Sequence, residues 1–447
     1  MTSERHAADL LETVARQVDG AEVYELHSLE LPVRFAFGEL ESLRSVETAG
    51  RALRLIKGGR LGFSTTTDLA DEVTLLRNAL ESAEFGDAAP FQFPEEQPAA
   101  DVACFDPQVE WLDEEKLIAM GEQIVEQIKA YDDQLQTEVS IHKSVQRVRL
   151  LNTSGLDVEY PRTGLAISIE VTRTREGDIL VVYDSASSHR AEDIDASVLA
   201  EDIIRRLRWS ERVVKAESRT MPVVFQRMGT AVPLLPLFSG LNGRQVFLGA
   251  SPLAKELGEQ AFDQRLTLVD DGRLDHASRS APFDDEGVPT TQKPLIEGGL
   301  VRQFLYDLKT AGLAGAQPTG NGFKSGPSGG GFQRPPNVAP STWLVTPGSQ
   351  RVNEILEGLN EALLVEQVIG LGQGNVMAGE FSNNVSVGFL VRNGEIIGRV
   401  KNTMIAGNVY QLLRDQLIAL GDEPSRVLGI LHVPAIAVDG VGVASRG

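Results

Sequence analysis

The chain has 447 residues, 42% of them hydrophobic and 23% charged, which is enough for two or three domains with a large core. Its formal net charge of −21 disfavours nucleic-acid binding through a broad basic surface, because such binding needs Lys and Arg at the phosphates. The single cysteine, Cys104, excludes a disulfide framework and any zinc cluster built from several cysteines of this chain.

Two segments are the candidates for a targeting sequence or a membrane span, and neither fits. The N-terminal residues form an amphipathic pattern without the apolar core of a signal peptide. The most apolar run, at 232–241, is broken by Pro233 and Pro236 and is too short to span a membrane. We therefore expect a cytoplasmic protein that does not enter a membrane.

Residues 1–216 predict an N-terminal α+β domain, with antiparallel strands and flanking helices. In chain order we expect a helix at 3–18, strands at 21–28 and 30–37, three short strands within 38–68, a helix at 70–85, an acidic linker at 87–108, a helix at 114–130, strands at 136–143, 145–152, 156–162, 164–174 and 178–186, and a helix at 191–210. Gly58-Gly59 predicts a tight hairpin, and Ala49-Gly50 is interpreted as a second turn.

Residues 217–447 predict a C-terminal domain that is mostly antiparallel β with few helices. We expect a strand at 221–227, an apolar helix at 228–242, a short helix or turn at 251–258, strands at 265–270, 295–297, 300–306 and 342–346, a helix at 351–359, short strands through 363–405, a helix at 407–420 and strands near 427–438.

Residues 283–336 are the most unusual stretch of the chain. They open with Asp284-Asp285-Glu286 and end in a loop rich in Gly, Pro, Ser and Asn, held between ordered elements. A loop of that length is uncommon in a compact domain and is usually functional or disordered. The three acids could bind a cation through oxygen ligands, although a solvated acidic turn is the simpler interpretation.

Side chains that could carry catalysis are scarce. The histidines are His6, His27, His142, His189, His276 and His432. No two lie within one helical turn, so a local two-histidine zinc motif is absent, while a site assembled from distant histidines stays open. We interpret His276 as a solvated loop residue. The sequence has no Gly-x-Ser-x-Gly elbow and no P-loop, and the acids flanking Cys104 disfavour a reactive thiolate.

Five segments, in the same order along the chain, resemble the TldD/PmbA family of U62 peptidases. They are 39–68, Asn152-Thr153-Ser154-Gly155, 283–289 (FDDEGVP), 318–322 (PTGNG) and 379–407. The resemblance implies a cytoplasmic dimer that degrades or trims peptides, in peptide maturation and antitoxin turnover. It also implies that the catalytic member, TldD, holds zinc through a helical His-Glu-x-x-x-His motif and a further cysteine near the C-terminus.

The chain departs from that zinc motif. If Gly240 matches the motif's glycine, Pro236 and Leu241 stand in the positions of the histidines and Leu237 in that of the glutamate. Residues 421–447 contain no cysteine. Proline and leucine offer no zinc ligand, so the resemblance implies a TldE/PmbA-like, metal-free subunit without a cofactor, and zinc is expected in a TldD-like partner.

Two functions from different classes follow. The chain is either the non-catalytic subunit of a heterodimeric metalloprotease that cleaves unfolded peptides, or a stand-alone or homodimeric binding protein without hydrolytic activity. An enzyme with chemistry that these motifs do not reveal is a third possibility. Glycine allows close backbone approach, and strand addition binds extended peptides, so we expect the loop to line a groove at a dimer interface. The residues predicted for it are Thr319, Gly320, Asn321, Gly322, Gly329, Gly330 and Gly331.

Overall fold

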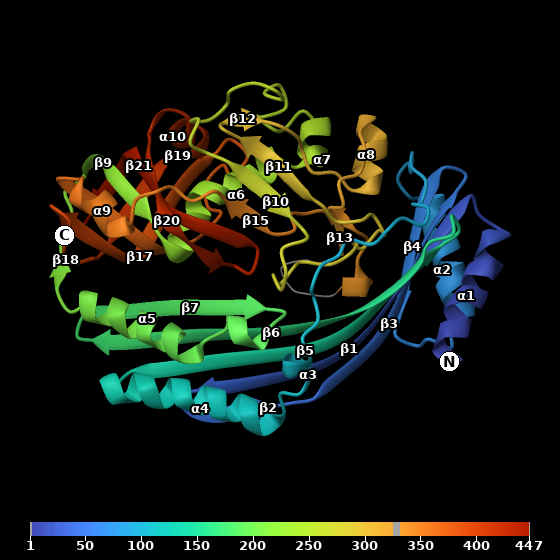
Figure 1. Ribbon diagram of the computed structural model, residues 1–447, viewed down its shortest axis with the longest axis horizontal. Helices are drawn as coiled ribbons and strands as arrows, with labels where there is room; N and C mark the ends of the chain where they lie inside the picture. The colour runs from blue at the N-terminus through green and yellow to red at the C-terminus, as the bar shows by residue number, and fades with distance from the viewer. Residues whose placement is uncertain (1, 325–330, 447) are drawn as a thin grey trace.

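The computed structural model describes residues 2–324 and 331–446 of the chain. Within them the chain builds two large, mainly antiparallel sheets with helices packed against them, which confirms the predicted α+β class. The long strands of the first sheet curve beneath the second domain, and the helices of the first domain lie on the outer side of that curve (Figure 1).

In the described chain the first sheet has seven strands, in the order β4-β3-β1-β5-β6-β7, with β2 paired to β1. They are β1 (Gly20–Ala36), β2 (Glu39–Leu43), β3 (Val46–Lys57), β4 (Arg60–Thr66), β5 (Gln136–Asn152), β6 (Asp157–Arg175) and β7 (Asp178–Ser188). The helices are α1 (Thr2–Ala15), α2 (Glu72–Glu84), α3 (Pro107–Glu110), α4 (Glu114–Tyr131), η1 (Ala191–Asp193) and α5 (Ala196–Trp209).

The two faces of the first sheet have different partners. Val23 of β1 packs with α1 and α2, and Val33 of the same strand packs with α4. Tyr24, which points the other way, packs with Phe332 of the second domain. Because side chains alternate along a strand, the helices cover one face and the second domain covers the other.

Several expected strand breaks are wrong, because the strands of the first sheet are long. The pairs 21–28 with 30–37, and 136–143 with 145–152, are each one strand, β1 and β5. The step at Ala49-Gly50 is not a turn, since β3 stays in register with β1 through it. The Gly58-Gly59 hairpin is confirmed.

Two glycine and proline positions explain these long strands. A Cβ on Gly50 would lie 2.1 Å from Cζ of Phe332, so the glycine makes room for that ring rather than for a turn. Pro161 lies inside β6, where pairing with β5 continues, but β7 pairs with β6 only from Leu165 onward. Pro161 therefore occupies an edge position, where a missing N–H donor is tolerated.

The second sheet contains twelve strands in the described chain, and a separate two-stranded sheet joins β13 to β14. The strands are β8 (Val213–Val214), β9 (Arg219–Phe225), β10 (Leu268–Asp271), β11 (Gln292–Glu297), β12 (Leu300–Val301), β13 (Gly322–Phe323), β14 (Asn337–Val338), β15 (Trp343–Val345), β16 (Glu361–Ile369), β17 (Glu380–Arg392), β18 (Glu395–Val400), β19 (Thr403–Asn408), β20 (Leu417–Val427) and β21 (Leu431–Ser445). The helices are η2 (Arg227–Thr230), α6 (Ala231–Gly240), α7 (Gly243–Phe247), α8 (Leu308–Ala314), η3 (Gly331–Gln333), α9 (Val352–Glu357) and α10 (Val409–Asp415).

Expectations for the second half are corrected at two places. The helix expected at 407–420 ends at Asp415, and the residues from Leu417 on form β20, which pairs with β21. Leucines spaced for a helix here also satisfy the alternation of a buried strand, and sheet pairing decides the outcome. The strand expected at 300–306 is confined to β12, whereas the short helix or turn expected at 251–258 is present as a turn.

The contact between Phe332 and Gly50 can be tested by adding one methyl group at the glycine. We expect Gly50→Ala to lower the free energy of unfolding by about 1–3 kcal/mol, because the new Cβ overlaps the Phe332 ring. The matched control is Gly442→Ala in β21, where the nearest atom to a Cβ is 3.4 Å away. Urea denaturation measures both variants, and equal stability of Gly50→Ala and the unmodified chain would contradict the packing described.

Candidate functional site

Helix α6 and Leu241, the residue that caps its C-terminus, carry the three positions that the resemblance assigns to the zinc motif. Pro236 is buried, and Leu237 and Leu241 are both 0% exposed within the apolar core of the second domain. The Tyr410 hydroxyl donates a hydrogen bond to the Pro236 carbonyl, with 3.1 Å between the oxygens. This helix therefore belongs to the core, and its side chains do not fit a zinc ion.

The other potential metal ligands are dispersed. Within residues 2–324 and 331–446, no three or more His, Cys, Asp or Glu side chains are grouped so as to hold a metal ion. His142 lies 3.2 Å from Glu30, and His276 is half-buried in a loop rather than fully solvated. Cys104 is buried, which raises the pKa of its thiol and disfavours the reactive thiolate.

The acidic cluster is buried, so its interpretation as a solvated turn is wrong. Asp284, Asp285 and Glu286 are 2%, 8% and 1% exposed. Asp284 accepts backbone N–H groups from Gly322 at 2.9 Å and from Val288 at 3.0 Å. Burial, and then the charge of Glu286, raise the pKa of Asp284 well above its usual range. The hydrogen bonds of this cluster hold in place the loop that contains it.

A buried ionic network joins this loop to the first sheet. Arg54 of β3 donates to Glu22 of β1 at 3.0 Å and also to Glu286 of the second domain. Glu286 in turn accepts the backbone N–H of Leu308 at 2.7 Å, at the start of α8. Burial lowers the pKa of Arg54, but Glu22 and Glu286 outweigh it, and the guanidinium stays charged. One cation therefore links both domains.

Lys324 is the second buried cation of this region. Its Nζ lies 3.7 Å from Oε1 of Glu22 and 4.7 Å from the centre of the Tyr24 ring. The Nζ atom has no hydrogen-bond partner among the described residues, and burial lowers the pKa of the side chain. Lys324 is therefore held much more loosely than Arg54.

The predicted glycine-rich site divides into buried and half-buried parts. Gly320, Asn321 and Gly322 are buried, and the Asn321 side chain donates to Asp270 at 2.9 Å. Thr319 is half-buried and accepts the backbone N–H of Tyr306 at 2.8 Å. The first part of the predicted site is thus built into the second domain.

The second part of that prediction is largely outside the described chain. Gly331, which begins η3, is half-buried and faces the first sheet near Leu26. Gly329 and Gly330 lie outside the described residues. The role of the whole set in binding a peptide or a partner stays a prediction.

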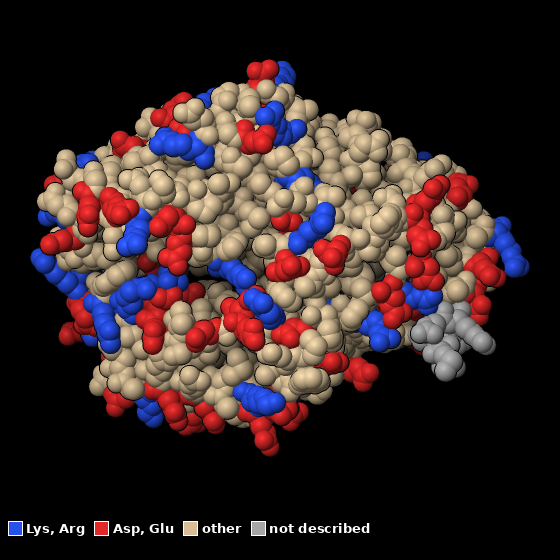
Figure 2. Space-filling view, in the orientation of Figure 1, with Lys and Arg blue, Asp and Glu red and all other residues tan. Residues whose placement is uncertain are grey.

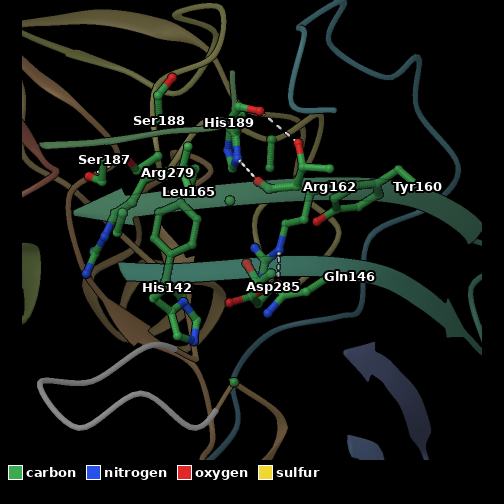
Figure 3. Close-up of a pocket in the computed structure, with 18 of the residues that line it drawn as sticks. His142, Gln146, Tyr160, Arg162, Leu165, Ser187, Ser188, His189, Arg279 and Asp285 are labelled. Atoms are coloured by element: carbon green, nitrogen blue, oxygen red, sulfur yellow. Dashed lines mark hydrogen bonds between the residues drawn. The ribbon is translucent and has the colours of Figure 1, made fainter. Parts of the chain in front are cut away.

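A cavity of about 300 Å³ lies between the two domains. Strands β5, β6 and β7 form one wall, and the segment that leads into the acidic cluster forms the other (Figure 3). Arg162 points across it toward Gln146 and Asp285. This cavity could not be predicted from the sequence, because Arg162 and Arg279 carry no local motif and come from different domains.

His189 closes one end of the cavity and is buried. Its Nδ1 contacts the Thr163 carbonyl and its Nε2 lies 3.1 Å from the Ser280 carbonyl. Burial lowers its pKa to about 4, although both carbonyls favour the protonated ring. A neutral ring donates only one of these hydrogen bonds, so one ring nitrogen faces a carbonyl as an acceptor.

Comparison with known families identifies three consecutive regions of the chain. Residues 21–85 match domain 1 of the PmbA/TldA metallopeptidases, residues 110–211 match the central domain, and residues 218–445 match the C-terminal domain. Together these regions include both walls of the cavity and helix α6.

Individual relatives cover nearly the whole chain. An uncharacterized protein of Methanocaldococcus jannaschii is 26% identical over 94% of this chain and 95% of its own length. Metalloprotease PmbA of Escherichia coli O157:H7 is 24% identical over 94% of this chain and 91% of its own.

Solved structures show the same fold. TldE of Thermococcus kodakarensis superposes with a TM-score of 0.89 at 21% identity, covering 98% of this chain and 100% of that one. A putative modulator of a DNA gyrase from Thermotoga maritima gives a TM-score of 0.88 at 25% identity, covering 99% and 100% of the two chains.

The two buried cations should respond differently to removal. Arg54→Met leaves Glu286 buried without its cation and Glu22 with only the more distant Lys324, so we expect it to lower the free energy of unfolding by about 3–5 kcal/mol. Lys324→Met leaves Glu22 paired with Arg54 and should cost about 1 kcal/mol or less. Urea denaturation at pH 7 measures both, and equal losses would show that Arg54 does not hold the domains together.

His189 should make stability depend on pH. Its pKa is about 4 when folded and near 6.5 when unfolded, so the unfolded chain binds more protons between these values. That contribution is complete above pH 6.5 and declines as pH falls toward 4. Between pH 7 and pH 5, we expect the free energy of unfolding to fall by about 2 kcal/mol less in His189→Gln than in the unmodified chain. Parallel urea titrations measure this, and identical pH slopes would refute the assignment.

Proposed function

This chain belongs to the PmbA/TldA metallopeptidase family, and from this premise we propose that it is the non-catalytic, TldE-like subunit of a heterodimeric metallopeptidase. Its partner is a TldD-like subunit that supplies the zinc ion and the general base. The substrate is an unfolded peptide, as in peptide maturation or antitoxin turnover. In this role the chain completes the substrate chamber and cleaves nothing alone.

The observation that supports this proposal is the identity and burial of the side chains on helix α6. A catalytic zinc site needs three protein ligands and an open position for water, and a base beside it. At the corresponding positions this chain has Pro236, Leu237 and Leu241, all packed into the core. Converting such a position into a ligand requires a polar side chain in an apolar site, which is costly.

The relatives and the surface support a role in a complex. Matching proteins are named both TldD homologue and PmbA metalloprotease, the two kinds of subunit that the proposal pairs. On the face shown in Figure 2, basic side chains are interspersed with acidic ones, which agrees with a protein or peptide partner better than with nucleic acid. None of the described helices is long and apolar enough to cross a membrane. We place the complex in the cytoplasm.

The proposal is tested by measuring zinc and cleavage for the purified chain, alone and mixed with a TldD-like partner. We expect the chain alone to contain no stoichiometric zinc by elemental analysis and to leave an unstructured peptide intact. The mixture should cleave the peptide, and a chelator should stop it, because the partner's zinc activates the water.

Two controls separate this role from the alternatives. Replacing the motif glutamate of the partner by glutamine should abolish cleavage by the mixture, whereas Pro236→Ala in this chain should not. Chelator-sensitive cleavage by the chain alone would overturn the proposal. Peptide binding without cleavage in any mixture would favour a stand-alone binding protein instead.

A further inference from the structure

The cavity between the domains contains two guanidinium groups that lack carboxylate partners. Arg162 of β6 donates through Nε to Oε1 of Gln146 at 2.5 Å, and Arg279 donates to the Pro340 carbonyl at 3.2 Å. Neither forms an ion pair with a carboxylate in the part of the chain that the structure describes. Both bonds use neutral acceptors, and Asp285 acts on the two charges only from beyond ion-pair distance.

These charges cannot be removed by deprotonation. An arginine side chain stays protonated in proteins, and withdrawing its charge from water without a paired counter-ion is unfavourable. Arg162 and Arg279 are both half-buried. Burial lowers the pKa of Arg279; the charges of Asp285 and Asp270 act against burial, and the charge of Arg162 acts with it. Arg162 and Arg279 line the same cavity, so two like charges share one site.

Asp285 is the carboxylate that lines the cavity, and its oxygens already have donors. Oδ1 accepts the Tyr24 hydroxyl at 3.3 Å, and Oδ2 accepts the backbone N–H of Lys324 at 2.7 Å. One carboxylate thus faces two guanidinium groups. His189 adds no positive charge near pH 7, because its pKa is about 4. The cavity carries a net positive charge.

The remaining lining combines hydroxyl groups with apolar side chains. Ser144, Ser187 and Ser278 contribute hydroxyls, and Leu165, Phe283 and Phe323 contribute an apolar wall. The volume of about 300 Å³ is at the small end of ligand pockets. Such a lining fits a short group with one anionic end and one apolar side chain.

We propose that this cavity binds the C-terminal carboxylate of a peptide, with Arg162 and Arg279 pairing with the carboxylate and the apolar wall contacting the last side chain. A guanidinium matches a carboxylate through two parallel hydrogen bonds. A bare inorganic anion would leave the apolar wall uncovered. The inference rests on the proposed function for the peptide nature of the ligand, and it identifies which part of the peptide this subunit holds.

The test uses the full chain alone, titrated by calorimetry with acetyl-Ala-Ala-Leu as the free acid and as its C-terminal amide. We expect the acid to bind at least tenfold more tightly than the amide. Arg162→Gln and Arg279→Gln should each weaken binding of the acid by roughly tenfold to a hundredfold. The matched control is Arg302→Gln, which removes an exposed arginine paired with Glu297 and should leave binding unchanged.

Several results would overturn the inference. Equal binding of acid and amide would do so, as would unchanged binding in both glutamine variants. Competition by inorganic phosphate at the same concentration as the acid would indicate a small-anion site, and equal binding of acetyl-Ala-Glu-Ala-amide would indicate a side-chain site. If a glutamine variant does not fold, Arg279→Lys is measured instead and should weaken binding several-fold, because lysine lacks the planar fork.

The outcome is separable from that of the proposed function. Binding is measured without a partner and without cleavage. A mixture that cleaves while the chain alone ignores the C-terminal carboxylate would overturn the cavity assignment and leave the accessory role intact. Binding of the C-terminal carboxylate by a chain that activates no partner would support the cavity assignment and overturn the accessory role.

Discussion

The arrangement of the two domains depends on the buried Arg54 guanidinium. It bridges Glu22, its neighbour in the first sheet, and Glu286 of the second domain. Three charges buried together are stable only when each has its partners, since removing one leaves the others without compensation. The two domains are thus held at one fixed separation, because the second carboxylate comes from a loop of the other domain.

That loop determines what surrounds it. Asp284 and Glu286 bind backbone N–H groups of Gly322 and Leu308, and Asp285 binds that of Lys324. A Cβ on Gly322 would lie 2.1 Å from Oε2 of Glu286. This glycine is therefore required by a close approach to the carboxylate. The same loop supplies Asp285 to the cavity, so its wall is as rigid as the ionic network beside it.

Local sequence patterns predicted the long helices of the first domain, the Gly58-Gly59 hairpin and the overall class, because each depends on neighbours in the chain. They failed where a distant residue decides. A turn was expected at Gly50, but this glycine lies in a strand and makes room for the Phe332 ring. A solvated turn was expected at the acidic cluster, but the cluster is buried beside Arg54. Glu286 and Arg54 are 232 positions apart, so no local pattern could reveal the pair.

The candidate site, too, could be predicted only in part from local sequence patterns, and this bears on the proposed function. The absence of zinc ligands on this helix was predicted from Pro236 and Leu237, and both residues lie in the apolar core. If the chain is the non-catalytic subunit that we propose, it acts through other surfaces. The charged cavity lies against β5 and β6 of the first domain and is not lined by α6. Among the described residues that line it, Arg162 and Arg279 outnumber the one carboxylate, that of Asp285, and give the cavity an excess of positive charge.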